Sequence, residues 1–288
     1  MTSIGRSSHG TATSVPWRPG LRRGLIEFKQ DFAPSRLPGQ LLWPIATLAA
    51  MHYFRDRLVD GVPLGTLMLP SVLGMFTIFG MQLMLQYLAA DREDGTLLRA
   101  RSTPHGIPAY LIGKFTLCTL TLLVYLAMIA VPGMFLVSGL APLTLSRLTT
   151  LAWVLVLGVA ASQALGAVLG ALVPSVRAAS YVALLLMGLI AISGIFYPIT
   201  ALPRWLQLMG ELGPIYWVGH AMRAALLPDA YGTTEPGSTW HLPTAAAVLL
   251  VWAAAGAMLA PRTLQAMTRK ESGTRLTDRQ QRALQRTI

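Results

Sequence analysis

Residues 63–104 read PLGTLMLPSVLGMFTIFGMQLMLQYLAADREDGTLLRARSTP. The first part of this stretch, 63–89, contains no Asp, Glu, Lys or Arg. It is longer than the roughly 20 residues that a helix needs to cross about 30 Å of hydrocarbon. A densely charged segment follows at once. The stretch therefore predicts a membrane-spanning helix that ends in a polar loop at a membrane surface.

Five further segments have a similar apolar character, and they cover 37–54, 107–137, 151–173, 178–197 and 243–261. Charged residues make up only 12% of the chain, against about 25% in an average soluble domain. So few charges cannot cover the surface of a soluble domain of this size. We predict an all-α integral membrane protein with six transmembrane helices.

The Lys and Arg residues are distributed unevenly between the loops. With the N-terminus inside, the inner segments hold 17 of the 23 and the outer segments hold 5. The remaining one, Lys114, lies near the start of the third span, where we expect its side chain to reach the interface. Because cytoplasmic loops carry an excess of positive charge, both termini are predicted to be cytoplasmic.

The net charge of +11 suggests nucleic acid as a possible partner, but the positions of the charges argue against it. They gather at the two ends of the chain and in one short loop, with no basic stripe of interleaved aromatic residues. Basic segments beside apolar spans instead indicate contact with anionic lipid headgroups. The single cysteine, Cys118, excludes an intramolecular disulfide.

The N-terminal region contains a short amphipathic segment, 18–32, beside the first span. One helical face of this segment carries Leu21, Leu25, Phe28 and Phe32. Such a helix suits the headgroup region of a membrane. We therefore divide the chain into a disordered tail at 1–17, a membrane domain at 18–262 and a basic tail at 263–288.

The outer segment 198–242 is rich in apolar residues. Two short amphipathic helices, about 202–211 and 214–227, fit its pattern, and each is too short to span a membrane. We expect re-entrant or interfacial helices with Trp205, Tyr216 and Trp217 at headgroup level. His220 is predicted to be solvated.

The inner loop after 63–89 predicts a short helix at the cytoplasmic surface. Gly95 allows a sharp backbone turn, Thr96 is a candidate cap, and Pro104 ends the helix. Charged residues bracket this helix, which is typical of a docking element for a soluble partner. An ordinary solvated loop is the alternative.

This loop resembles that of the membrane-spanning subunits of ABC-2 type ABC exporters. The family pattern has an acidic and a basic residue, then Gly-Thr-Leu, and Thr-Pro six residues later; here these are Asp91, Arg92, Gly95, Thr96, Leu97, Thr103 and Pro104. A second similar stretch is SGIFYP at 193–198, followed by LPRWL at 202–206. His220 departs from the family, where an acid is frequent at this position.

The resemblance implies a mechanism and assigns residues to it. The coupling helix that contacts an ATPase would comprise Asp91, Arg92, Glu93, Asp94, Gly95, Thr96, Leu97, Arg101, Thr103 and Pro104. The segment with Leu21, Leu25, Phe28 and Phe32 would be the elbow helix. The outer re-entrant region would comprise Phe196, Tyr197, Pro198, Pro203, Trp205, Pro214, Tyr216 and Arg223. Two such membrane subunits and two ATPases would form the exporter.

The chain contains no Walker A motif. The nearest candidate, Gly106 to Phe115, has the wrong glycine spacing and Phe in place of Ser or Thr. The resemblance therefore implies that ATP and Mg are bound by a partner ATPase, and that this chain has no cofactor and no metal site of its own.

The substrate is expected to be a drug, an antibiotic or a lipid-like compound, because the spans are apolar with few polar groups. Candidate pathway residues are Gln82, Gln86, Tyr87, Gln163 and Tyr181. Polysaccharide or glycolipid is the alternative substrate. An ion-driven carrier, a membrane scaffold or sensor, and an intramembrane enzyme remain as alternative functions. The composition suggests a bacterial inner membrane.

Overall fold

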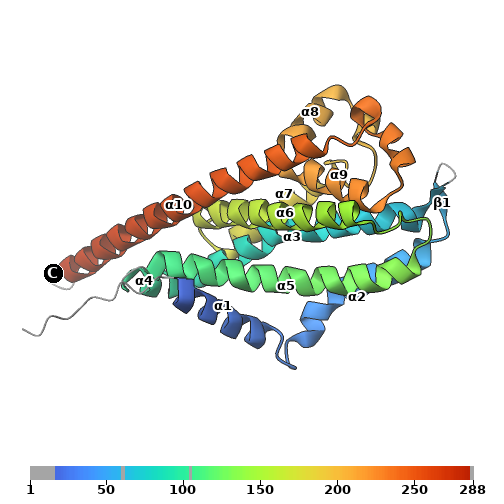
Figure 1. Ribbon diagram of the computed structural model, residues 1–288. Helices are drawn as coiled ribbons and strands as arrows, with labels where there is room; N and C mark the ends of the chain where they lie inside the picture. Colours follow the sequence, from blue (N-terminus) through green and yellow to red (C-terminus); the bar gives the residue numbers. More distant parts are fainter. Residues whose placement is uncertain (1–16, 60–61, 104–105, 286–288) are drawn as a thin grey trace, which may run out of the picture.

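The computed structural model describes residues 17–59, 62–103 and 106–285. Several long helices run side by side, and the long C-terminal helix lies at an angle to them (Figure 1). The α-helices are α1 Trp17–Asp31, α2 Leu37–Phe54, α3 Leu64–Glu93, α4 Thr96–Arg101, α5 Gly106–Leu136, α6 Leu145–Leu172, α7 Val176–Ala191, α8 Arg204–Leu212, α9 Pro214–Leu226 and α10 Leu242–Gln285. Short 3-10 turns cover Ile199–Ala201, Asp229–Thr234 and Pro236–Ser238, and the two-residue strands β1 Leu58–Val59 and β2 Val62–Pro63 pair antiparallel.

All six segments predicted to span the membrane are helical, and the prediction of an all-α membrane protein is confirmed. Four helices are long and apolar enough to cross a bilayer: α3, α5, α6 and the Leu242–Arg269 part of α10. The apolar helix α7 is shorter, with 16 residues. It ends at Ala191, before the predicted residue 197, since Gly194 turns the backbone away with a φ of +73°.

Helix α10 is longer than predicted. The expected boundary near residue 262 is no helix end, because α10 continues through Pro261 to Gln285. Leu264 and Met267, beyond that boundary, are buried against α4 and α5, and this packing stabilises the extension. The predicted disordered tail falls outside the described residues except for Trp17, as do residues 286–288.

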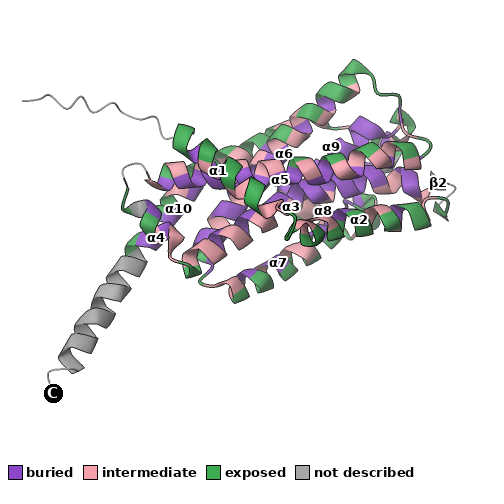
Figure 2. Cartoon of the chain, turned by 90° about the horizontal axis from the view of Figure 1, so that it is seen from below, coloured by how far each residue is buried: buried purple, intermediate pink, exposed green. Residues whose placement is uncertain are grey.

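Helix α3 forms the centre of the bundle, where it packs against α5, α6, α7 and α9. In its most apolar stretch 72% of the residues are buried, against 17% for α10 (Figure 2). Small residues allow this close packing. A Cβ on Gly166 of α6 would lie 2.3 Å from the backbone oxygen of Met81, so only glycine fits there.

The two ends of the bundle differ in what they carry. Helix α4 and the later part of α10 lie at one end, and the β1–β2 pair lies at the other (Figure 1). Sequence analysis predicts that the α4 end is cytoplasmic.

Candidate functional site

Helix α4, the predicted coupling helix, begins directly after Gly95. This glycine has a φ of +70° and is itself the N-cap residue. Thr96 is the first helical residue, and its hydroxyl accepts a hydrogen bond from Arg99 at 3.0 Å. The prediction that Thr96 caps the helix is therefore wrong, since the chain turns one residue earlier.

One side of α4 is anchored in the bundle. Leu97 and Ala100 are buried in a cluster with Tyr110 of α5 and Met267 of α10. Asp94 and Arg99 are exposed on the other side. Thr103 donates a hydrogen bond to the backbone oxygen of Ala100, whereas the side chain of Arg101 and all of Pro104 lie outside the described residues.

Three consecutive residues before α4 contact three different parts of the bundle. The Asp91 carboxylate accepts a hydrogen bond from the Tyr110 hydroxyl of α5 at 2.7 Å. Arg92 donates to the backbone oxygen of Val173 at the end of α6. The Glu93 carboxylate accepts from the backbone N–H of Val176 at the start of α7, at 2.8 Å. This segment joins α4 to the ends of three helices.

Lys114 lies at the centre of a buried ion cluster. Its Nζ is 2.7 Å from Glu27 of α1 and 2.9 Å from Asp91. The side chain is only 5% exposed. The expectation that Lys114 reaches the interface is therefore wrong, because two carboxylates from other helices satisfy its charge inside the bundle.

The Glu27 carboxylate is held in its charged form. Burial by itself raises the pKa of this group, but the hydrogen bonds from Lys114 and Arg23 outweigh it, so that the pKa lies below its ordinary value. Arg23 is 2.7 Å from Glu27, and its guanidinium also lies over the Tyr110 ring. The cluster thus connects the predicted elbow helix, α5 and the segment that leads into α4.

Helix α1, the predicted elbow helix, packs along α5 through glycines. Gly20 and Gly24 are its buried residues. Of the predicted apolar face, Leu21 and Leu25 are exposed, while Phe28 and Phe32 are partly buried with ring centroids 4.8 Å apart. The apolar face therefore remains available to lipid beside the glycine contact.

Replacing Gly24 with alanine is expected to displace α1 from α5. A Cβ at this position would lie 2.5 Å from the Gly113 backbone oxygen, and backbone cannot move aside as a flexible side chain can. The expected result is a lower melting temperature in detergent. Leu25→Ala, on the exposed side of the same helix, serves as the control and should leave the melting temperature nearly unchanged.

The outer region contains the two short helices that the sequence predicts, α8 and α9. Every residue of α9 is buried, including Tyr216 and Trp217. Other helices cover these two residues, since α9 packs between α3, α6 and α10; their headgroup level stays a prediction. Trp205 of α8 is 62% exposed.

The turn between α8 and α9 reaches into the depth of the bundle. The Trp252 indole N–H of α10 donates a hydrogen bond to the Leu212 backbone oxygen at 2.9 Å. Trp252 lies ten residues after Leu242, or roughly 15 Å along α10 at 1.5 Å per residue. The α8–α9 turn thus packs beside roughly the first three turns of α10, and its re-entrant position in a membrane stays a prediction.

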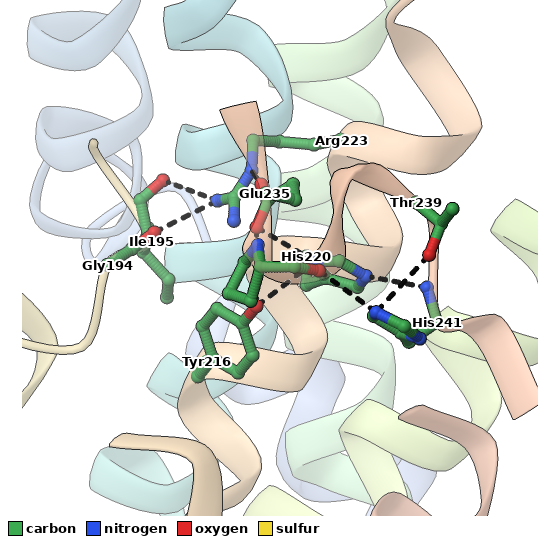
Figure 3. Close-up of polar contacts among 9 residues, drawn as sticks. Gly194, Ile195, Tyr216, His220, Arg223, Glu235, Thr239 and His241 are labelled. Atoms are coloured by element: carbon green, nitrogen blue, oxygen red, sulfur yellow. Dashed lines mark hydrogen bonds and ion pairs between the residues drawn. The ribbon is translucent and has the colours of Figure 1, made fainter. Parts of the chain in front are cut away.

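A buried polar cluster joins α9 to the loop that follows it (Figure 3). The Glu235 carboxylate accepts hydrogen bonds from Arg223 at 2.7 Å, from His220 Nδ1 at 3.1 Å and from the Tyr216 hydroxyl at 3.2 Å. The His220 side chain is fully buried. The prediction that His220 is solvated is wrong, because Glu235 folds back over α9 and supplies its partner.

The hydrogen bonds indicate which atoms of this cluster carry protons. His220 Nε2 accepts from the backbone N–H of His241 at 3.2 Å, so Nδ1 carries the proton that is donated to Glu235. Burial raises the pKa of the Glu235 carboxyl, but the hydrogen bond from His220 and the charge of Arg223 outweigh this and lower it to about 2. Glu235 is therefore an anion at neutral pH.

Arg223 also binds the segment that connects α7 to α8. Its Nη1 donates to the backbone oxygens of Gly194 and Ile195, at 3.0 and 3.1 Å (Figure 3). The other predicted outer residues lie around this connection. Phe196 is half-exposed, the Tyr197 hydroxyl donates to Ala191, and Pro198, Pro203 and Pro214 stand at the starts of helical turns.

The predicted pathway residues are spread over different surroundings. Gln163 is buried beside Thr119, at the wall of a hollow of about 500 Å³ between α5, α6 and α10. The Tyr87 hydroxyl donates to Asp31 at the end of α1, and Tyr181 is 66% exposed on α7. Gln82 and Gln86 are partly buried on α3. Because Gln163 borders a hollow and Tyr181 lies on an exposed face, these two predicted pathway residues do not share one site.

Sequence reasoning missed Glu27 and Glu235 as site residues. Glu27 stands within the amphipathic segment, and Glu235 follows the second short outer helix. Glu27 stands four residues after Arg23, a spacing that predicts a pair on one helix, whereas Glu235 lies in a polar loop without a local signal.

Comparison with protein families gives one match. The model described as "ABC-2 type transporter" matches residues 32–227, more than half of the chain. The matched region begins just after α1 and includes α2 to α9. Of the two polar clusters, Arg23, Glu27, Glu235 and His241 lie outside it. No curated protein matches the sequence.

Proposed function

This chain belongs to the ABC-2 type transporter family, and from that premise we propose that it is the permease of an ATP-driven exporter whose ATPase is a separate chain. The family makes it a membrane subunit of an ABC transporter and implies an ABC ATPase partner. The separate partner chain, the direction of transport and the substrate are parts of our proposal. The partner would bind ATP and Mg, and this chain would bind neither.

The contacts of 91–93 support a coupling role for α4 more than any other observation. Asp91, Arg92 and Glu93 bind α5, the end of α6 and the start of α7. Since Lys114 links Asp91 to Glu27, α1 joins the same unit. A partner that displaces α4 would therefore act on several helices at once, as coupling of ATP hydrolysis to transport requires.

We propose a hydrophobic or amphipathic substrate, such as a drug, an antibiotic or a lipid-like compound. The apolar hollow beside Gln163 supports this class, because apolar walls with only two polar side chains, Thr119 and Gln163, suit such molecules. We further propose a bacterial inner-membrane location with both termini in the cytoplasm, and an assembly of two permeases, alike or different, with two ATPases. The positive charge at the α4 end supports this orientation.

The experiment that tests the proposal is purification of the tagged chain in mild detergent, with mass spectrometry of its partners. A co-purifying chain with a Walker A motif, in equal amount, is the expected result. Inside-out vesicles that contain the complex should then take up a hydrophobic fluorescent dye when ATP is added. Absence of any ATPase from a monodisperse preparation would overturn the proposed partnership, and uptake of a labelled glycolipid in place of the dye would correct the substrate.

Replacing Gly95 with valine is expected to uncouple transport from ATP hydrolysis. Gly95 has a φ of +70°, and this backbone conformation costs a β-branched residue on the order of 1–2 kcal/mol. A Cβ would meet no atom within 4 Å, so the effect is a change in the direction of α4 and not a clash. We expect at least tenfold less dye transport per ATP hydrolysed, with normal insertion.

Gly95→Asn is the matched control for this variant. Asparagine tolerates positive φ far better than valine does. The asparagine variant should keep most of the transport. Equal loss in both variants would contradict the argument from backbone conformation, and no loss in either would contradict the coupling role of α4.

A further inference from the structure

A second, partly open hollow lies where the α8–α9 turn meets the bundle. Its volume is about 260 Å³, and its walls come from α3, α6, α7, α8, α9 and α10. Met81, Val168, Leu189, Met209, Pro214 and Trp252 are among the lining residues. The hollow is distinct from the one beside Gln163 and includes none of the residues of the two polar clusters.

We place the hollow at hydrocarbon depth because Trp252, which lines it, is the middle residue of the predicted span 243–261. Trp252 is roughly 15 Å along α10, and its hydrogen bond to Leu212 holds the α8–α9 turn at the same level. Half of a hydrocarbon core about 30 Å thick is the same distance. The hollow therefore lies far from the headgroups.

The walls offer nothing to a polar occupant. Only two lining residues, Ser193 and Trp252, carry a polar side chain, and both already have partners. The Ser193 hydroxyl donates to the Ile190 backbone oxygen at 2.7 Å, and the Trp252 N–H donates to Leu212. A polar molecule would lose its hydrogen bonds to water on entry. Apolar cavities of even about 150 Å³ stay dry and take up hydrocarbon.

The entrance to the hollow is lined by apolar residues at the surface. Leu189 and Ile192 at the end of α7 are 44% and 41% exposed, and Met209 of α8 is 58% exposed. At this depth the surroundings of an exposed apolar surface are lipid chains. An occupant would thus enter sideways from the bilayer, between α7 and α8.

We propose that this hollow binds one fatty acyl chain of a membrane phospholipid. The chain fills the space beneath the re-entrant turn and supports α8 and α9 from the side of the bilayer. Bound lipid thereby contributes to the packing of the outer half of the protein. This inference does not depend on the export function, because it concerns the lining, depth and entrance of the hollow alone.

Quenching of Trp252 fluorescence tests the proposal. The purified protein, with any partner that accompanies it, is placed in nanodiscs of phosphatidylcholine with bromine atoms midway along one acyl chain. The Trp252→Phe variant is measured in parallel, and the difference isolates the emission of Trp252. We expect this emission to fall by more than half relative to nanodiscs without bromine.

Two variants that fill the hollow separate a bound chain from lipid that merely surrounds the protein. Val168→Phe fills the hollow from α6, and Leu189→Phe narrows its half-exposed entrance with little risk to folding. Each should restore at least half of the lost emission. Leu185→Phe, on an exposed position of α7 at 73% exposure, is the matched control and should restore none.

Two results would overturn the proposal. Quenching that both filling variants leave unchanged would mean that Trp252 senses only surrounding lipid. Absence of quenching in the wild-type protein would mean that something other than lipid, such as a second copy of the chain, covers the entrance.

Discussion

Replacing Lys114 with methionine is expected to destabilise the protein by about 3 kcal/mol, the lower end of what removal of one partner from a buried ion pair costs. Asp91 would keep only the Tyr110 hydroxyl as a partner at this position, while Glu27 would keep Arg23. A buried carboxylate without a counter-charge is costly. The melting temperature in detergent, followed by tryptophan fluorescence, should fall clearly.

A compensated double variant distinguishes loss of charge balance from loss of packing. In Lys114→Met with Asp91→Asn, the unpaired carboxylate is gone while the volume is nearly kept. We expect this variant to regain more than half of the lost stability. If it melts as low as Lys114→Met alone, the charge of Asp91 is not the cause, and the role that we give to the ion cluster is wrong.

The second large effect is expected at Glu235, and it depends on pH. The pKa of this carboxyl is about 2 in the folded protein, below its ordinary value of 4.5. A lowered pKa means that the charged form stabilises the fold. This contribution is fully present above pH 4.5 and is lost as the pH falls from 4.5 towards 2. The difference corresponds to about 3 kcal/mol.

Glu235→Gln removes the charge and keeps the shape, so it tests this contribution directly. At pH 7 the variant should be less stable than the wild-type protein, because Arg223 loses its anionic partner. Between pH 4.5 and 3 the two melting temperatures should approach one another. Parallel curves over this range would show that another group causes the acid sensitivity. Asp229→Asn, at an 85% exposed carboxylate, should follow the wild-type curve.

The sequence predicts the helices of this protein well. The bounds 37–54 for α2 agree with the structure, and those for α8 and α9 differ by at most two residues. Long apolar runs and Gly or Pro at their ends determine these bounds locally, and local signals are the ones that a single sequence contains. The extension of α10 was missed because Leu264 and Met267 acquire their partners only in the folded bundle.

The polar clusters were less accessible to prediction for a physical reason. Lys114 and Glu27 are 87 positions apart, and nothing in either segment specifies the other. His220 and Tyr216 looked like surface residues because the short helix that carries them is polar enough for an interface. Burial of α9 depends on α3, α6 and α10 together, and Glu235 reaches His220 only through the turns after α9. Long-range pairing of this kind is a property of the assembled bundle.

The contacts of residues 91–93 limit insertions and deletions in this part of the chain during evolution. Each of the three side chains has a different partner because successive residues of a helix point about 100° apart. Inserting or deleting one residue of α3 ahead of Asp91 would rotate all three away from their partners together. Point substitutions can be absorbed one by one, but a change of length cannot. The part of α3 that leads to Asp91 should therefore keep its length across generations in which its individual residues vary.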